Sequence, residues 1–135
     1  MSLLLDTDVC IALLRGRLHR PRRLVAASLD EGRTLYVSAI SLHELWFGVA
    51  GSARPEAGAE ELVHLATVLN ILDFSSEDAR AAGRIRGDLK RLGTPIGPFD
   101  VLIAGQALAR DLILATGNLH EFARVPGLKV ESWLD

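Results

Sequence analysis

Short apolar runs alternate with longer stretches of helical periodicity along the chain. The apolar runs are bounded by polar or glycine residues and predict buried strands, at 2–5, 34–38, 71–74, 112–116 and 128–135. The longer stretches carry helix-start and helix-end residues and predict helices, at 7–16, 19–32, 39–52, 60–70, 75–93 and 99–111. This alternation predicts an α/β fold, a single domain over 1–135, with a mainly parallel sheet covered by helices on both faces.

Three segments carry more specific expectations. Residues 52–59 are rich in turn-forming residues and predict a loop, and 117–127 predicts a loop with one turn of helix. Helix 99–111 is apolar on nearly all sides and is therefore expected to be buried. Helix 39–52 separates its positions into one apolar stripe, made of Leu42, Leu45, Trp46 and Val49, and an opposite stripe made of Ser41, Glu44 and Gly48.

Composition narrows the class of protein. The chain is 49% hydrophobic, which is ample for a core, and its net charge of −2 gives no overall basic signature of nucleic-acid binding. Its single cysteine, Cys10, excludes an intrachain disulfide, fits a cytoplasmic setting and is expected to be a small core residue. The N-terminus does not read as a signal peptide, and no apolar segment approaches the length of a membrane span.

Polar residues follow the predicted strands where each passes into a helix or loop. Asp6 follows the first strand, Glu44 lies in the first turns of helix 39–52, and Asp100 lies at the head of the buried helix. Asn118 and Glu121 follow the fourth strand. Ligands of open parallel sheets bind outside the carboxyl ends of the strands, so these five residues are candidates to meet there.

Each candidate also has a purely structural interpretation. Asp6 can cap a helix, and Asn118 can serve as a cap or turn residue. Ser41 and Glu44 match the S-x-x-E capping box, in which the glutamate only satisfies a backbone N–H. Asp100 in a first helical turn complements the helix dipole.

Together the acids favour a cation site. Asp6 ends a buried strand, and Asp100 heads a buried helix, yet neither has a lysine or arginine within two residues. A desolvated carboxylate raises its pKa or acquires a cation. Oxygen ligands without a Cys/His cluster indicate Mg²⁺ or Mn²⁺, and the four histidines lack zinc spacing. Asp8 fits either a neighbour of the metal or an exposed residue of the first turn.

The stretches "LLLDTDVCIALLRG", "VSAISLHELWFG" and "PFDVLIAGQALARDLILATGNLHEFARVPGL" together resemble the PIN domain, and most closely the toxins of VapBC-type toxin–antitoxin pairs. The resemblance covers almost the whole chain. It implies an α/β/α sandwich and a metal-dependent ribonuclease. Asp6, Glu44 and Asp100 match the first three acids of the family site.

The fourth site position departs from the family pattern. Many members carry an aspartate where this chain has Asn118, and others pair an asparagine with an acid three residues later, here Glu121. Because asparagine supplies no charge, the resemblance implies one metal ion more firmly than two. Thr7, Ser41 and Thr116 match hydroxyl positions that orient ligands or phosphate, or else serve as caps and turn residues.

A phosphodiesterase of this kind needs a cation, because clustered carboxylates alone would repel RNA. We expect Asp6 and Asp100 to be the principal metal ligands, direct or through water, with Glu44 as a ligand or water-positioning base. Asn118 and Glu121 are secondary positions.

A basic cluster after the first helix is a candidate phosphate contact, formed by Arg15, Arg17, Arg20, Arg22 and Arg23. A second basic set is interpreted as a solvated helix face, formed by Arg80, Arg84, Arg86, Lys90 and Arg91.

The resemblance further implies an RNA substrate, a VapB-type antitoxin that blocks the site and a homodimer. Trp46, Phe47 and the apolar excess suit an interface, although Trp46 on the apolar stripe also suits the core.

Two alternative functions stay open at this point. One is a PIN-like binding module with weak or no catalysis, which Asn118 permits. The other is a haloacid-dehalogenase-like phosphatase, whose apolar strand also ends in D-x-D, although this chain lacks its later acid pair.

Overall fold

The computed structural model of the protein describes residues 2–16 and 18–134. Its sheet has five strands, β1 (Ser2–Leu5), β2 (Thr34–Ser38), β3 (Asn70–Leu72), β4 (Ile113–Thr116) and β5 (Val130–Ser132). They lie in the order β3-β2-β1-β4-β5, and every pairing is parallel. The helices are α1 (Thr7–Arg15), α2 (His19–Asp30), α3 (Ala39–Ala50), α4 (Pro55–Val68), α5 (Ser76–Leu92), α6 (Pro98–Ala109) and α7 (Leu119–Phe122). The predicted α/β fold with a parallel sheet is confirmed.

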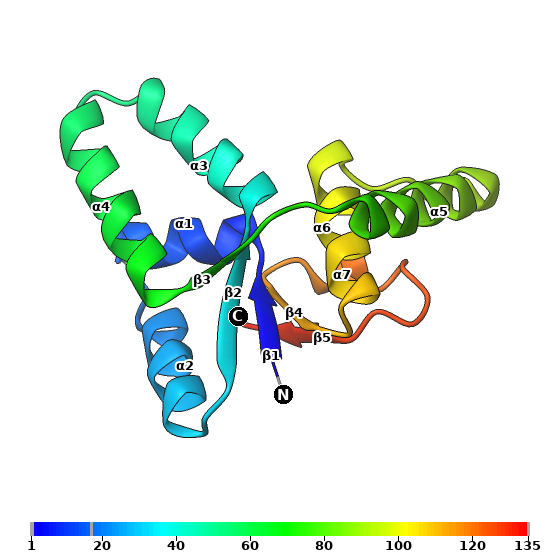
Figure 1. The fold of residues 1–135 in the computed structure, drawn as a ribbon, viewed down its shortest axis with the longest axis horizontal. Helices are drawn as coiled ribbons and strands as arrows, with labels where there is room; N and C mark the ends of the chain where they lie inside the picture. The colour runs from blue at the N-terminus through cyan, green and yellow to red at the C-terminus, as the bar shows by residue number, and fades with distance from the viewer. Residues whose placement is uncertain (1, 17, 135) are drawn as a thin grey trace.

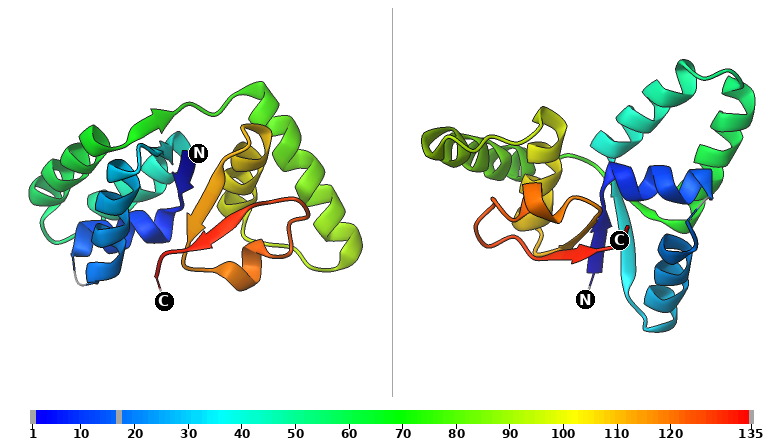
Figure 2. Two further views of the ribbon diagram at one scale, coloured as in Figure 1. Left: turned by 90° about the horizontal axis from the view of Figure 1, so that it is seen from below. Right: turned by 180° about the vertical axis from the view of Figure 1, so that it is seen from behind.

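Helices cover both faces of the sheet, with α1–α4 on one side and α5–α7 on the other (Figure 1 and Figure 2). The central strand β1 shows why, because successive side chains of a strand point to opposite faces. Leu3 and Leu5 pack with the core of the α1–α4 side, whereas Leu4 packs with the core of the α5–α7 side. All three leucines are fully buried. An uninterrupted apolar run is therefore what a strand covered on both faces requires.

The direction in which strands are added to the sheet reverses between β3 and β4, on the two sides of β1. From β1 the chain proceeds outward through β2 to β3, and it then returns to the other side of β1 to build β4 and β5. Leu5 is paired with Ala115, so the carboxyl ends of β1 and β4 lie side by side. The backbone N–H of Asp6 donates to the Ala115 carbonyl, 3.0 Å away. A reversal of this kind leaves a crevice for ligands at the carboxyl edge of the sheet.

Close packing of α5 against α6 fixes the start of α6 near this edge. A Cβ added to Gly105 of α6 would lie 2.5 Å from the backbone nitrogen of Ala82 on α5, so only glycine allows this approach. At one end of the contact, Asp78 of α5 accepts hydrogen bonds from Arg110 and Gln106. Half of α6 is buried, namely Val101 and the run from Ile103 to Ala107, so its predicted burial holds for the middle of the helix and not for its two ends.

Some sequence boundaries were wrong. Helix α4 begins at Pro55, inside the predicted loop 52–59, because proline suits the first helical position, where no N–H is needed. Strand β3 covers 70–72 and not 71–74. Trp46 does not belong to the buried stripe of α3, since 43% of its surface is exposed. In the described part of the chain, no helix is both long and apolar enough to cross a membrane.

Candidate active site

Asp6 occupies the crevice between β1 and β4 as the residue that precedes α1. Its side chain is only 3% exposed. Oδ1 accepts the backbone N–H of Val9 at 2.9 Å, so Asp6 does cap α1. Oδ2 accepts a hydrogen bond from the Thr116 hydroxyl at the end of β4. Burial, together with the nearby Asp8 charge, raises the pKa of Asp6 to about 6 despite these hydrogen bonds.

Glu44 reaches the same region from α3 and is held by Thr7. The Thr7 hydroxyl donates to Glu44 Oε1 at 2.7 Å and also lies 2.9 Å from the hydroxyl oxygen of Ser41. The capping-box interpretation of Ser41 and Glu44 is wrong, because Ser38 caps α3 through a bond from Ile40 N. Ser41 instead lies inside the first turn and is fully buried. The Glu44 side chain is therefore not used to cap its own helix, and it is available to bind a ligand in the crevice.

Asn118 and Glu121 form a hydrogen-bonded pair after β4. The Asn118 side chain caps α7 by accepting the Glu121 N–H at 3.3 Å, and its Nδ2 donates to Glu121 Oε2 at 2.6 Å. Glu121 Oε1 accepts the backbone N–H of Gly97 at 2.9 Å. The Thr116 hydroxyl that binds Asp6 also accepts the Asn118 N–H at 2.9 Å. Thr116 therefore connects Asp6 to the Asn118–Glu121 pair.

Asp100, in the first turn of α6, lies among the other acids. Burial raises its pKa to about 7, with further contributions from a hydrogen bond to Glu121 and from the charges of Glu121, Asp6 and Glu44. Its ionisation is thus opposed by three carboxylates at once. The structure brings the four predicted acids, from β1, α3, α6 and α7, to one edge of the sheet.

The donor set fits a hard divalent cation. The four acids supply carboxylate oxygens, and the salt bridges formed by the described residues involve none of them. Within residues 2–16 and 18–134, however, no three His, Cys, Asp or Glu side chains are already arranged to hold an ion. Glu44 and Glu121 are turned toward Thr7 and toward Asn118 and Gly97. For more than two of the acids to bind an ion directly, side chains must rotate. Without rotation, the remaining acids can contact the ion only through water.

Asp8 and Cys10 have simpler positions. Asp8 is exposed on the first turn of α1, and its contribution to the site is the negative charge that it adds near Asp6. Cys10 is a buried core residue, as expected, and burial raises the pKa of its thiol.

The first basic cluster begins at the end of α1 that is farther from Asp6. Helix α1 has nine residues and extends about 13 Å, which separates Asp6 from the loop at its other end. Arg15 lines a groove of about 300 Å³ that also reaches Glu44. Arg20 donates to the Ser132 carbonyl at 3.2 Å. All the described members are exposed, namely Arg15, Arg20, Arg22 and Arg23, and Arg17 lies outside the described residues.

Gly97 is a site residue that the sequence did not identify. A Cβ added there would lie 3.0 Å from Asp100 Oδ2 and 3.7 Å from Glu121 Oε1. The absence of a side chain therefore lets the Gly97 backbone lie close to both acids, and its N–H donates to Glu121. The sequence signal was the pair Gly97–Pro98 at a helix start, which by itself indicates only a turn.

Comparison with known proteins gives matches over nearly the whole chain. The PIN domain family model matches residues 3–128. The chain is 36% identical over 133 residues to the tRNA(fMet)-specific endonuclease VapC of Salmonella typhimurium, with 98% of each chain covered. It is 33% identical to Ribonuclease VapC2 of Rickettsia felis, again with 98% of each chain covered. Among solved structures, it is similar to VapBC2 of Rickettsia felis bound to a promoter DNA fragment, with a TM-score of 0.93 and 32% identity, over 98% of this chain and 99% of that one.

Proposed function

Because the chain belongs to the PIN-domain family, and within it to the VapC ribonucleases, we propose that it is a metal-dependent endoribonuclease and the toxin of a toxin–antitoxin pair. One observation supports the chemistry above all. Asp6, Glu44, Asp100 and Glu121 converge on the carboxyl edge of a parallel sheet without a basic partner among the described residues. Carboxylates gathered in this way suit a divalent cation that in turn attracts a phosphodiester.

The proposed division of roles follows from the hydrogen bonds. Asp6 and Asp100 hold Mg²⁺ or Mn²⁺, directly or through water, and Thr116 orients Oδ2 of Asp6. Thr7 holds Oε1 of Glu44, which leaves Oε2 to orient the attacking water and accept its proton. A bound divalent ion supplies a lowered water pKa and screens the phosphate charge.

Asn118 and Glu121 are proposed as the secondary positions. Asn118 holds Glu121 through Nδ2, and Glu121 stays close enough to Asp100 to raise its pKa. A third and a fourth carboxylate would allow a second ion to be held beside the first, as in two-metal phosphodiesterases. Because Asn118 is neutral, the proposal requires only one.

The proposed partners are an RNA substrate, a VapB-type antitoxin that blocks the site and a second copy of the chain. The similar Rickettsia felis structure is a VapBC complex bound to DNA, which supports the antitoxin. For the homodimer, the support is an exposed apolar surface on α3, where Trp46 is 43% and Phe47 78% exposed. The cytoplasmic setting indicated by the single cysteine stays a prediction.

The main alternative is a PIN-like binding module without catalysis, which a neutral Asn118 permits. The test is cleavage of a panel of structured RNAs, tRNAs included, with and without Mn²⁺ or Mg²⁺. We expect Asp6→Ala and Asp100→Ala each to lower the cleavage rate by at least ~10²–10³-fold, since losing a metal ligand removes several kcal/mol of transition-state stabilisation. Cleavage that survives in EDTA, or in both variants, would contradict the proposal, and an inactive wild type that still binds RNA would support the binding module. The phosphatase alternative predicts phosphate release from small monoesters.

A further inference from the structure

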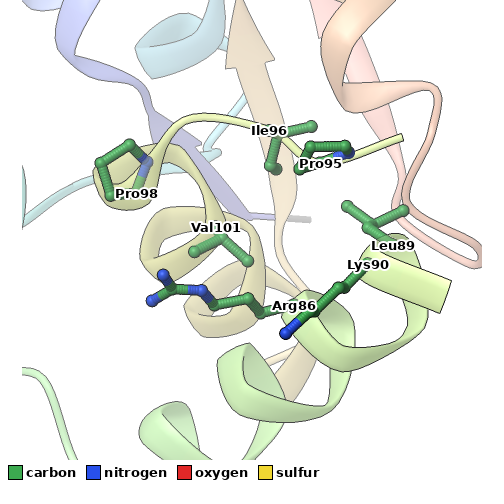
Figure 3. A pocket seen from close by; sticks show the side chains of 7 residues that line it. All are labelled: Arg86, Leu89, Lys90, Pro95, Ile96, Pro98 and Val101. Carbon is green, nitrogen blue, oxygen red and sulfur yellow. The ribbon is translucent and has the colours of Figure 1, made fainter. Parts of the chain in front are cut away.

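A cavity of about 440 Å³ lies between α5 and the segment that leads into α6. Helix α5 contributes Arg86, Leu89 and Lys90 to its wall, and the segment opposite contributes Pro95, Ile96 and Pro98 (Figure 3). We refer to it as the α5–α6 cavity. Its volume falls within the ~300–1,000 Å³ typical of small-ligand pockets. The site described above does not include it.

The α5–α6 cavity is positively charged. Arg86 and Lys90 are four residues apart on α5 and therefore share one face of the helix. In Figure 3 both side chains extend along the same side of the cavity. Its lining contains no acid. In the described part of the chain, the neighbouring Arg91 forms an ion pair with Asp88 and Arg110 with Asp78, whereas no ion pair involves Arg86 or Lys90.

The α5–α6 cavity adjoins the carboxylates through three consecutive residues. Ile96 and Pro98 line it, and Gly97 between them donates its N–H to Glu121. A Cβ on Gly97 would also touch Asp100. A polymer whose phosphodiester lies at the carboxylates can therefore continue across this segment into the cavity.

From this continuity and this charge we propose that the α5–α6 cavity binds a nucleotide of the RNA substrate next to the cleaved bond, with Arg86 and Lys90 neutralising its phosphate. Leu89, Pro95 and Ile96 supply apolar walls for the ribose or base. Only these two members of the second basic set would then contact substrate, and the interpretation as a solvated helix face is kept for the others. This inference rests on the proposed ribonuclease function.

The test compares two double variants with the same loss of charge on the same helix. Arg86→Gln/Lys90→Gln removes both cations of the cavity. Arg80→Gln/Arg84→Gln, the matched control, removes two exposed cations at the same four-residue spacing outside it. Binding of a fluorescein-labelled single-stranded RNA dodecamer is followed by anisotropy in EDTA at 50–200 mM KCl, and cleavage of the same RNA is followed with Mn²⁺.

We expect the cavity variant to bind RNA about 10-fold more weakly at low salt. The slope of log K against log salt concentration should fall by about 0.7, because the two cations neutralise one phosphate and each phosphate contact with a single strand contributes about 0.7. In cleavage, KM should rise while kcat stays near that of the wild type, and the control should match the wild type in both assays.

Two results would overturn the inference and leave the ribonuclease proposal intact. One is a wild type that cleaves RNA while both double variants show the same KM and salt slope. The other is a cavity variant that changes the sedimentation of the protein but not its RNA affinity, which would assign the cavity to an interface between copies. A wild type that cleaves no RNA would instead contradict the proposed function, and the nucleotide site with it.

Discussion

Asp78 and Asp6 are almost equally buried carboxylates at helix N-termini, with exposed fractions of 1% and 3%, but their surroundings are opposite. Asp78 completes the capping box of α5 and accepts two hydrogen bonds from Arg110. Burial alone would raise its pKa, but Arg110 and Ser75 hold that pKa below its usual range. Asp6 has a cap bond and a hydroxyl but no cation, and its pKa is raised.

The difference teaches that burial does not by itself identify a functional acid. A buried carboxylate with a fixed counterion is complete, and it contributes to stability as a structural link between α5 and α6. A buried carboxylate without a counterion is costly to ionise, and it is a candidate to bind a cationic ligand from outside the protein. Asp6, together with three partly buried acids that also lack a counterion among the described ion pairs, distinguishes this edge of the sheet from the Asp78 pair.

The strongest test of this comparison concerns stability without metal. Asp78→Ala should lower the free energy of unfolding by about 2–3 kcal/mol, because it removes a cap bond and the bonds to Arg110 and Gln106. Asp6→Asn should leave the free energy of unfolding unchanged or higher, since asparagine still caps α1 and no charge is buried. Urea unfolding at pH 7.5 in EDTA measures both. A destabilised Asp6→Asn together with an unaffected Asp78→Ala would reverse our assignment of structural and functional acids.

The same comparison applies to activity. Glu121→Gln should lower the RNA cleavage rate about 10–100-fold, the usual cost of losing a group that supports metal binding. Asp78→Ala should retain the wild-type rate at a temperature where it stays folded. Single-turnover cleavage with Mn²⁺, with folding checked by circular dichroism, measures both. Equal losses in the two variants would mean that the acids of the site act only through stability.

Gly97 tests how closely the acids must approach. Gly97→Ala is compatible with the backbone, at φ −55° and ψ 150°, but places a methyl group against Asp100. We expect the cleavage rate to fall about 10-fold and Mn²⁺ to bind more weakly, with little change in stability. Gly83→Ala on α5, where an added Cβ meets nothing within 4 Å, is the matched control. Titration with Mn²⁺ by calorimetry gives the binding readout independently of activity.

The last test concerns the pH dependence of stability in the metal-free protein. Asp6 and Asp100 have folded-state pKa values of about 6 and 7, above the ordinary aspartate value of 3.8. The folded state therefore holds more protons than the unfolded state in this range, and its stability falls as pH rises from 5 to 7.5. Asp78 has a lowered pKa and acts only at more acidic pH, where its contribution is lost as the pH falls.

Urea unfolding in EDTA at pH 5 and at pH 7.5 checks this dependence. The loss of stability should be smaller in Asp6→Asn and in Asp100→Asn than in the wild type. Mn²⁺ at pH 7.5 should restore stability to the wild type, because a ligand that binds only the folded state stabilises it. A wild type that is equally stable at both pH values would argue against unpaired acids at this edge.

Much of the fold could be predicted because its information is local. The leucines of β1, the β-formers of β2 and the Ser75 and Gly93 ends of α5 each mark an element within a few residues. The prediction of an element boundary failed where a helix-start residue lay among residues typical of loops. Pro55 was assigned to a loop because of its neighbours, although it starts α4.

The absence of nearby bases favours a cation site at Asp6 and Asp100, but the same rule does not identify the partner of a paired acid. Asp78 has Arg80 within two residues, yet its partner in the structure is Arg110, 32 residues away. Asp6 and Asp100 lack both local and distant partners among the described ion pairs. Sequence neighbours therefore carry little information about which acids are paired.

The sequence by itself determined the alternation of strands and helices, the burial of β1 and of the middle of α6, and the position of each acid just after a strand or at a helix start. Each of these depends on the residue types within one or two turns of chain. Only the tertiary structure decided that Thr7 holds Glu44, that Thr116 joins Asp6 to Asn118, and that Gly97 brings its N–H to Glu121. The bond between Thr116 and Asn118 is local, but the other contacts connect residues that are separated by 24 to 110 positions in the sequence. These contacts form because β4 is added on the opposite side of β1 from β2 and β3. No local sequence pattern encodes this order of strands.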